Sequence, residues 1–360
     1  PLRAGTPFGE PGRGRHIFQE HPSGGIAVEE AERSAARWQR AGKTCLGVLC
    51  DGSYECVLTI FGAALAGLQV VLLDGNLPEA QLSTLIRATD VDVLWGTEVL
   101  DEDMTPYLTE GVREGRGRIL FFTSGTTSSS KAVVLTQASL CASAWNGSAL
   151  LPLQEEDTLL CLLPLNHVFG FVCGLLWGLH CGACVALGRG ARYYPLDLNH
   201  FRPTAVSVVP TLLGFLLKQK ALNPELRLVL IGAGDCPPAL PVAVKALRIR
   251  VSFGYGLTET SSGVALSLGE DPYAMTLCPD NRVTLAADGE ILIENHTCIM
   301  QGYYKDPAST AEVLKDGVLH TGDLGCFDAK GLLHVTGRKK EILVFPDGNK
   351  LYLPEYEARI

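Results

Sequence analysis

Residues 121–135 of the chain, FFTSGTTSSSKAVVL, combine residue types that suit the binding of a polyphosphate. An apolar stretch leads into a run of small or hydroxyl-bearing residues, which closes on Lys131 before the chain becomes apolar again. Small side chains let backbone N–H groups approach phosphate oxygens, the hydroxyls add donors, and the lysine adds a positive charge. The spacing is not that of the Walker loop, and a strand rather than a helix is expected to follow. The segment therefore predicts a phosphate-binding loop, with a flexible Ser/Thr linker as the alternative.

A second segment, residues 251–263, has the sequence VSFGYGLTETSSG. It places Tyr255 between two glycines directly after an expected strand, at the carboxyl edge where α/β sheets bind ligands, and an aromatic ring there can stack on a base. Thr258 and Glu259 follow on the same turn, and a carboxylate near phosphates is a natural ligand for Mg²⁺. The alternative is an ordinary strand-to-helix turn with an N-capping threonine.

Two further segments place a charged residue at a turn. Asp323 lies in LHTGDLG between expected β-strands, and Arg338 follows Gly337 in VTGRKKEI. A carboxylate can accept hydrogen bonds from two ribose hydroxyls, and an arginine can bind ribose or phosphate oxygens. Taken separately, such segments are more often a surface turn and a solvated charged run.

The elements that must position these segments alternate between strand and helix up to residue 265. Apolar runs without polar alternation are separated by helical segments, a pattern typical of parallel sheets covered on both faces. We therefore predict a doubly wound α/β body. The expected strands lie within residues 44–52, 69–76, 91–96, 118–127, 204–210, 226–234 and 250–256, and the expected helices within residues 27–43, 53–68, 82–90, 136–151, 211–222 and 240–247.

The pattern changes near residue 265, where short strands around Asp-Gly and Lys-Gly turns replace the alternation and no further helix is expected. This predicts an α/β body at residues 1–265, a small β subdomain at 266–338 and, at 339–360, the start of another unit with a strand pair across PDGN. The apolar stretch 168–188 is long enough for a membrane span. Its five glycines and its CVAL run instead favour a buried helix followed by a strand.

Composition argues against several classes of protein. With 47% hydrophobic and 19% charged residues among 360, the chain is of ordinary globular type. A formal net charge of -9 and the lack of a basic stripe argue against nucleic acid as a partner. The twelve cysteines lie mostly in apolar runs without framework spacing, which favours a reducing, cytoplasmic environment. The pair Cys181 and Cys184 is interpreted as core packing rather than a redox or zinc site.

In their order along the chain, the four segments resemble the motifs of the adenylate-forming (AMP-binding) superfamily, which includes acyl-CoA synthetases, luciferases and peptide-synthetase adenylation domains. The family's TSGTTGxPKG corresponds to residues 123–132, YGxTE to 255–259, TGD to 321–323 and GRxK to 337–340. Residues 163–170, LPLNHVFG, resemble the motif with a histidine beside the acyl pocket, and residues 231–238, IGAGDCPP, the strand end against adenine. Ser128, Ser130 and Ala132 replace the usual glycine, proline and glycine.

The resemblance implies a fold of two doubly wound α/β subdomains with a small distorted β-barrel, and a C-terminal lid domain that is mostly absent. It implies that Lys131, Thr258, Glu259 and His167 act in catalysis, with Glu259 as the Mg²⁺ ligand, and that Lys340 lies at the hinge to the lid. The implied ATP-binding residues are Thr123, Ser124, Gly125, Thr126, Thr127 and Lys131 at the phosphates, Thr258 at the α-phosphate, Gly232, Ala233, Gly234, Gly254, Tyr255 and Gly256 at adenine, and Asp323 and Arg338 at the ribose.

By the same resemblance, the chain is expected to be an AMP-forming acid–thiol ligase that uses ATP, Mg²⁺ and coenzyme A. A carboxylic acid would attack the α-phosphorus and release pyrophosphate, and the thiol of coenzyme A would then displace AMP from the acyl-adenylate. The family's catalytic lysine belongs to the C-terminal domain, so we expect this chain to lack that region. Two alternatives stay open: an acyl-AMP ligase that loads the thiol of an acyl carrier protein, and a nucleotide-binding protein without catalysis.

The residues near His167 bear on the identity of the acid. No acidic residue follows the phenylalanine of NHVFGFVCGLL, so an acid without an α-amine is expected. The sequence looks most like long-chain fatty acyl-CoA synthetases, although the choice between fatty and aryl acids stays open. The expected wall of the acid pocket is apolar and consists of Val168, Phe169, Phe171, Val172, Leu175, Leu176, Val264, Ala265 and Leu266.

Overall fold

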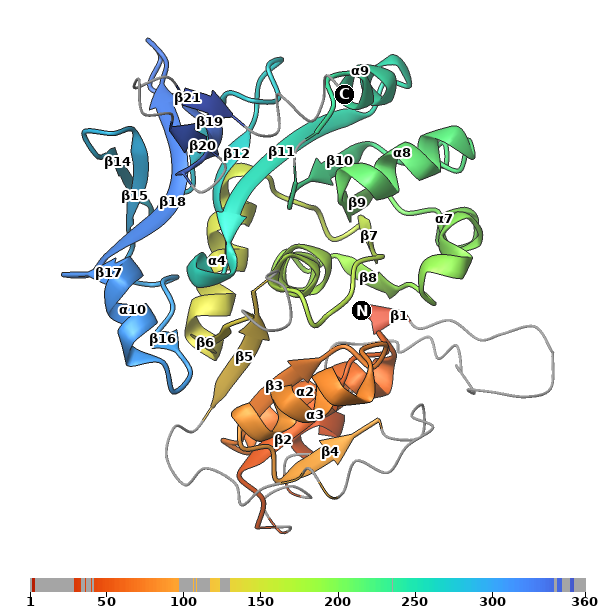
Figure 1. Cartoon of the computed structure of the whole chain (residues 1–360). Helices are drawn as coiled ribbons and strands as arrows, with labels where there is room; N and C mark the ends of the chain where they lie inside the picture. The colour runs from red at the N-terminus through yellow and green to blue at the C-terminus, as the bar shows by residue number, and fades with distance from the viewer. Residues whose placement is uncertain are drawn as a thin grey trace.

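A computed structural model describes residues 29–33, 42–96, 117–123, 130–234 and 236–339, the isolated residues 36, 40, 106 and 108, and the backbone of short strands at 2–3, 342–344 and 350–352. The described chain is a mixed α/β protein built on two main sheets (Figure 1). This confirms the α/β class predicted from the sequence.

The first sheet contains the N-terminal alternation of strands and helices and has the order β16-β6-β5-β3-β2-β4. Its strands are β2 (Cys45–Leu49), β3 (Gln69–Leu73), β4 (Val93–Trp95), β5 (Arg118–Phe122), β6 (Ala132–Thr136) and β16 (Gly302–Tyr303). Strands β2 to β5 are parallel, whereas β6 is antiparallel to β5 and to β16. Helices α2 (Tyr54–Leu65) and α3 (Glu79–Ala88) lie between the parallel strands in sequence. Every residue of β2 and β3 is buried, which explains their uninterrupted apolar sequences.

The second sheet begins with parallel strands, of which β8, β9 and β10 are green in Figure 1. In spatial order these are β1 (Leu2–Arg3), β8 (Cys184–Leu187), β7 (Thr158–Cys161), β9 (Ala205–Val208), β10 (Leu228–Ile231) and β11 (Arg250–Leu257). Helices α7 (Tyr194–Phe201), α8 (Pro210–Lys218) and α9 (Ala239–Ala246), with the 3₁₀ turn η4 (Ala191–Tyr193), connect them. The result is a second parallel α/β unit, in agreement with the two α/β subdomains that the resemblance implies.

Strand β11 joins this parallel region to an antiparallel one. It pairs with β10 through Phe253 and, from Gly254 onward, with β12 (Ser262–Ser267). The antiparallel region continues through β13 (Met275–Leu277), β19 (Leu333–Arg338), β18 (Val318–Phe327), β15 (Glu290–Glu294) and β14 (Arg282–Leu285), and β17 (Leu314–Lys315) pairs with β18. A separate antiparallel pair, β20 (Ile342–Val344) and β21 (Lys350–Tyr352), confirms the strand pair predicted across PDGN.

Three sequence-based expectations in this region are wrong. Asp323, expected in a turn between strands, lies inside β18 and is paired with Arg338 of β19. Helix α10 (Pro307–Val313) lies within the β subdomain, where no helix was expected. The Asp306 side chain caps it by accepting a hydrogen bond from Ser309 N (2.9 Å), and a proline occupies its first turn. Tyr255 lies inside β11 rather than after it, because pairing with β12 extends the strand to Leu257.

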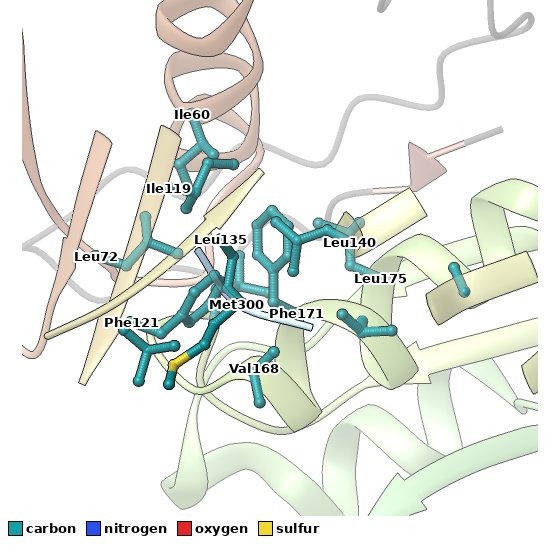
Figure 2. Packing of buried hydrophobic residues seen from close by; sticks show 14 of the residues in the cluster. Ile60, Leu72, Ile119, Phe121, Leu135, Leu140, Val168, Phe171, Leu175 and Met300 are labelled. Atoms are coloured by element: carbon teal, nitrogen blue, oxygen red, sulfur yellow. The ribbon is translucent and has the colours of Figure 1, made fainter. Parts of the chain in front are cut away.

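Residues 168–180 form three adjoining helical segments, α5 (Val168–Phe171), the π-helical η3 (Val172–Leu176) and α6 (Trp177–His180). With β8 they confirm the predicted buried helix and strand, and no helix in the described ranges is long and apolar enough to cross a membrane. The Phe171 ring lies edge-on to Phe121 of β5 (centroids 5.5 Å apart). Figure 2 shows this helical region packed against Leu140 of α4 (Gln137–Leu150) and side chains of the first sheet. One core therefore connects the two sheets and fixes the strand ends that bear the candidate residues.

Candidate active site

The two ends of the predicted phosphate loop are held together where β5 ends and β6 begins. Thr123 N donates a hydrogen bond to Lys131 O (3.0 Å), and Lys131 N donates to Thr123 Oγ1 (3.1 Å). Ser130 Oγ donates to Thr123 O (2.8 Å). These bonds close the neck of the loop, so Lys131 has a fixed backbone position. The predicted phosphate ligands Ser124, Gly125, Thr126 and Thr127 lie outside the described residues.

Lys131 is connected to Glu259 through Tyr303. The Lys131 ammonium nitrogen lies 4.6 Å from the centroid of the Tyr303 ring, a cation–π contact. The Tyr303 hydroxyl donates to Glu259 Oε1 (2.7 Å). Burial and the nearby Glu259 carboxylate raise the pKa of Tyr303 well above its ordinary value, so the hydroxyl stays protonated and remains a donor. The structure therefore brings together a lysine and a carboxylate that are far apart in the sequence.

The turn that contains Thr258 and Glu259 is fixed by buried hydroxyl residues. It is the 3₁₀ turn η5 (Thr258–Thr260). The Thr260 hydroxyl accepts from Leu257 N (3.0 Å) and lies within donor distance of Leu257 O (3.0 Å) and Ser262 O (2.9 Å). Ser261 and Ser262 adopt φ of 53° and 103°, which residues other than glycine hold only where their surroundings enforce it. The position of the Glu259 backbone is thus strongly determined.

A glycine is required just before this turn. A Cβ at Gly256 would lie 1.6 Å from Ser262 O, so β11 and β12 can approach this closely only without a side chain. The pairing of β11 and β12 shifts register between Tyr255 and Gly256. The GYG sequence therefore has a packing reason beside any role at a ligand.

Asp323 contacts two other predicted nucleotide-binding residues, Tyr255 and Arg338. The Tyr255 hydroxyl donates to Asp323 Oδ2 (2.9 Å), and Arg338 Nε forms an ion pair with Asp323 Oδ1 (2.7 Å). Asp323 and Arg338 face each other across β18 and β19. The Asp323 side chain is only 3% exposed, and this burial raises the pKa of its carboxyl above the ordinary value, although Arg338 and Tyr255 act in the opposite direction. The three side chains meet in the structure, while their roles at a nucleotide stay predictions.

The glycine-rich segment after β10 lies level with Tyr255. Ile231 of β10 is paired with Phe253 of β11, so residues 232–234 and 254–256 leave the parallel sheet at the same edge. A Cβ at Gly232 would lie 2.9 Å from the Phe169 ring, which shows that the phenylalanine packs on this glycine. Phe169 thus links the predicted acid region to the predicted adenine region.

His167 is the residue before α5 and is exposed to solvent. Protein atoms around the ring disfavour its charged form and lower its pKa, against the opposing effect of Asp74. The neutral ring can therefore act as a hydrogen-bond partner near neutral pH. Within the described parts of the chain, no hydrogen bond or ion pair connects His167 to the other candidates.

Most of the expected acid-pocket residues are buried in packed clusters. Six belong to the core that joins the sheets, one belongs to a neighbouring cluster, and two are partly exposed. These are Val168, Phe171, Val172, Leu175, Val264 and Ala265 in the core, Leu266 in the neighbouring cluster, and Phe169 and Leu176. The pocket wall stays a prediction, and Phe169, which packs on Gly232, is its member nearest the predicted adenine region.

The structure describes the pair Cys181 and Cys184 but not the predicted hinge lysine. Cys184 is buried in β8 and Cys181 is half-buried, and none of the twelve cysteines, all of them described, forms a disulfide. Over the described ranges no group of three or more His, Cys, Asp or Glu side chains could hold a metal. Both observations agree with core packing. Lys340, the predicted hinge residue, lies outside the described residues.

Sequence reasoning missed Tyr303 and Thr260. Tyr303 joins the site because β16 crosses to the first sheet and pairs with β6, opposite Val133. No local pattern announces such a crossing. Thr260 begins a run of hydroxyl residues, TSS, directly after Glu259. Such residues often bond nearby backbone groups, which was the available signal.

Comparison with known proteins identifies the family. The chain is 28% identical over 369 residues to the 2-succinylbenzoate–CoA ligase of Bacillus licheniformis, covering 91% of this chain and 77% of that protein. It is 27% identical over 391 residues to the long-chain-fatty-acid–CoA ligase FadD15 of Mycobacterium bovis, covering 91% and 63%. Among solved structures, the O-succinylbenzoate coenzyme A synthetase (MenE) of Bacillus subtilis in complex with AMP superposes with a TM-score of 0.79 at 22% identity, covering 92% and 76%. A family model described as AMP-binding enzyme matches residues 109–304, more than half of the chain, and the chain therefore belongs to the AMP-binding enzyme family.

Proposed function

We propose that the protein uses ATP to activate a carboxylic acid as an acyl-adenylate and transfers the acyl group to the thiol of coenzyme A. The observation that supports this is a row of contacting side chains drawn from separate segments of the chain. In order along the row these are Lys131, Tyr303, Glu259, Tyr255, Asp323 and Arg338, with Glu259 and Tyr255 connected through the end of β11. Lys131, proposed for the phosphates, begins this row, and Asp323 with its ion-pair partner Arg338, proposed for the ribose, ends it. This order agrees with the order of groups in a nucleoside triphosphate.

Lys131 and Thr258 would bind the phosphates. The lysine emerges from the neck of the loop, and the threonine begins the turn η5. When the acid attacks the α-phosphorus, negative charge accumulates on the phosphate oxygens and on the departing pyrophosphate. Donors and a positive charge fixed in advance stabilise that charge without further reorganisation.

Glu259 fits the requirements of Mg²⁺. Its Oε1 accepts from Tyr303, and its side chain is only partly buried, so the carboxylate is accessible to an ion. Mg²⁺ is usually bound by one or two carboxylates together with substrate phosphates and water, so a single glutamate suffices. When bound, the ion would neutralise charge on the phosphates.

Asp323 would accept hydrogen bonds from the ribose hydroxyls, and Arg338 would contact the ribose or a phosphate oxygen. In the structure Asp323 and Arg338 form an ion pair with each other, and the Tyr255 hydroxyl also donates to Asp323. A ribose hydroxyl can add a donor to the buried carboxylate, whose Oδ1 has an ion-pair contact but no well-aligned hydrogen bond. Tyr255 would then stack on adenine beside the glycine-rich segment 232–234.

The reaction proceeds in two displacements. A carboxylate oxygen of the acid forms a bond to the α-phosphorus, and the bond to the β-phosphate oxygen breaks, releasing pyrophosphate. The sulfur of coenzyme A then attacks the acyl carbon, its proton leaves, and the bond to AMP breaks. The first step converts a poor leaving group into a good one, and binding geometry lowers the barrier further.

The acid is proposed to be apolar and to lack an α-amine, with a fatty acid as the first candidate. Phe169, packed on Gly232, provides an apolar surface beside the adenine region, and His167 precedes it as a neutral polar group. The named relatives include a fatty-acid ligase and a 2-succinylbenzoate ligase, so an aryl acid is the second candidate. A cytoplasmic location is also proposed, supported by twelve cysteines that form no disulfide in the described parts of the chain.

The test is an acid panel of fatty, aryl and α-amino acids, scored by pyrophosphate release and by thioester formed with coenzyme A or with an acyl carrier protein. We expect release with a fatty or aryl acid and a thioester of coenzyme A. Lys131→Met should abolish release, whereas Lys330→Met, at an exposed turn, should not change it. Thioester formed only on the carrier protein would indicate the alternative acceptor. Retained AMP binding without acid-dependent pyrophosphate release would refute catalysis and favour a nucleotide-binding protein.

A further inference from the structure

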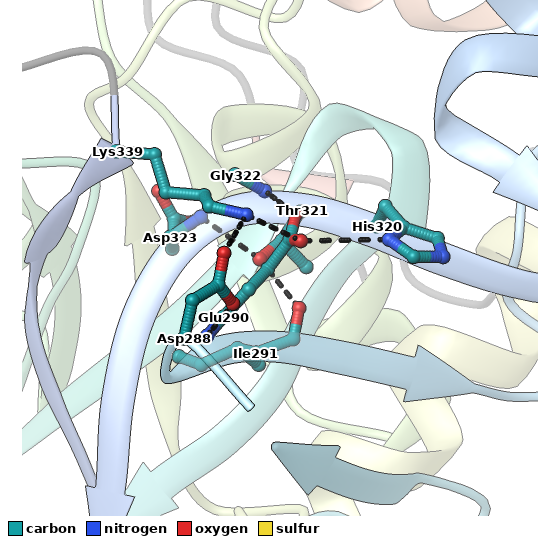
Figure 3. A network of polar contacts seen from close by, with 8 residues as sticks. All are labelled: Asp288, Glu290, Ile291, His320, Thr321, Gly322, Asp323 and Lys339. Atoms are coloured by element: carbon teal, nitrogen blue, oxygen red, sulfur yellow. Dashed lines mark hydrogen bonds and ion pairs between the residues drawn. The ribbon is translucent and has the colours of Figure 1, made fainter. Parts of the chain in front are cut away.

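Glu290 has a buried carboxylate whose partners all belong to the segments around Asp323 and Arg338 (Figure 3). Glu290 begins β15 and is paired with Leu324 of β18, with an irregularity in the ladder just after it. Its side chain is 9% exposed. A carboxylate is costly to bury unless it is paired and hydrogen-bonded, so the burial of Glu290 depends on these partners.

One oxygen of Glu290 holds the part of β18 that bears Asp323. Gly322 N donates to Glu290 Oε1 (2.9 Å). The neighbouring Thr321 hydroxyl donates to Ile291 O (2.8 Å) and accepts from Asp323 N (3.0 Å). Gly322 itself adopts φ of 73°, a left-handed conformation suited to glycine. Residues 321–323 of β18 are thus attached to β15 through Gly322 N and through the Thr321 hydroxyl.

The other oxygen holds the strand that bears Arg338. Lys339 Nζ lies 2.9 Å from Glu290 Oε2 and 2.6 Å from Asp288 Oδ2. His320 Nδ1 lies 3.4 Å from the same Glu290 oxygen. Lys339 directly follows Arg338, so its ion pair with Glu290 restrains the end of β19. Burial alone would raise the pKa of Glu290, but hydrogen bonds from Lys339, Gly322 and His320 outweigh it and hold the pKa below the ordinary value.

We infer that Glu290 is a positioning residue for ribose recognition, holding the Asp323 segment of β18 and the Arg338 end of β19 in register without touching the nucleotide. The inference rests on the proposed function, because it assigns a ribose to Asp323. It predicts a specific defect. Loss of Glu290 should weaken the contacts to the ribose hydroxyls and leave the contacts to adenine and phosphate intact.

The test compares binding of AMP, 2′-deoxy-AMP and 3′-deoxy-AMP by isothermal titration calorimetry. The variants are Glu290→Ala, Glu290→Gln and, as a matched control on the same strand, Glu294→Gln, whose side chain is 38% exposed. Wild-type protein should prefer AMP to both deoxy analogues. Glu290→Ala should weaken AMP about tenfold or more, the effect of hydrogen bonds to a charged group, and change the analogue Kd values little.

Glu290→Gln provides a second variant in case the alanine variant does not fold. Glutamine keeps an oxygen for Gly322 N but cannot form the ion pair with Lys339, so we expect an intermediate loss of preference for AMP. Equal weakening of all three nucleotides would indicate a merely structural role and would overturn the inference, as would an unchanged preference. Wild-type protein that binds none of the three would refute the proposed function itself, so the two failures are distinguishable.

Discussion

Replacing Tyr255 by phenylalanine tests the contact that joins the two halves of the candidate nucleotide site. The lost hydrogen bond runs from the tyrosine hydroxyl to Asp323 Oδ2 (2.9 Å), and the aspartate side chain is 3% exposed, so water is poorly placed to replace the donor. Hydrogen bonds to charged groups contribute about 1.5–3 kcal/mol. At about 1.4 kcal/mol per factor of ten, the unfolding equilibrium constant of Tyr255→Phe should rise about 10- to 150-fold.

The loss should depend on pH in a defined direction. Burial raises the pKa of Asp323, and the Tyr255 hydrogen bond lowers it, so removing the hydroxyl raises the folded-state pKa further. An acid with a raised pKa destabilises the folded state once it ionises, and this penalty is larger in the variant. The stability gap between wild type and Tyr255→Phe should therefore grow as pH rises through the folded-state pKa of Asp323 and narrow below it.

The assay is urea unfolding followed by far-UV circular dichroism at about pH 8 and at the lowest pH, about pH 4, at which both proteins remain folded. Tyr194→Phe is the matched control, because the Tyr194 hydroxyl donates to the neutral Leu162 carbonyl (2.8 Å). The control should lose about 0.5–1.5 kcal/mol at both pH values. A loss in Tyr255→Phe that is no larger than in the control, or that is the same at both pH values, would refute the reasoning.

Three further variants or conditions test other parts of the site. Gly256→Ala should fail to fold or be severely destabilised in thermal unfolding, because its Cβ would meet Ser262 O at 1.6 Å, whereas Gly263→Ala, with no atom within 4 Å of its Cβ, should fold normally. AMP affinity, measured by calorimetry, should fall as pH decreases through the pKa of Asp323, and the fall should begin above the range of an ordinary aspartate; a flat profile would argue against a carboxylate acceptor. Glu259→Gln should unfold at the wild-type urea concentration yet lose most Mg²⁺-dependent pyrophosphate release, and wild-type rates would show that the metal ligand is misassigned.

The sequence predicts the fold well where local pattern and tertiary environment agree. Strands β2 and β3 are buried on both faces, and their continuous apolar sequences indicate this directly. The same holds for residues 168–180, where glycines allow close packing within an apolar helix. It fails at α10, which is short and has no buried residue, so it lacks the apolar periodicity by which helices are detected. The Asp-Pro pair at its start was the only sign of it.

The candidate site can be predicted from the sequence only in part, for a related reason. Residues with suitable chemistry, such as Tyr255 and Asp323, can be proposed one by one from the sequence, and the structure places these two within hydrogen-bond distance. Their partners are harder to find. Tyr303 contacts Glu259 and Lys131 only because β16 leaves the β subdomain to join the first sheet. That crossing depends on tertiary packing and has no counterpart in local periodicity.

Strand β15 shows what periodicity omits. In its sequence EILIE, Glu290 and Glu294 are four residues apart and should share the solvent face. Glu294 is partly exposed, but Glu290 is buried: the ladder is irregular just after it, and its side chain packs against the Gly322 segment of β18. A carboxylate stays buried only where its partners offset the cost of desolvation. The partners of Glu290 are the backbone of Gly322, next to Asp323, and the side chain of Lys339, next to Arg338. The departure from alternation therefore occurs where Glu290 holds the segments that bear Asp323 and Arg338.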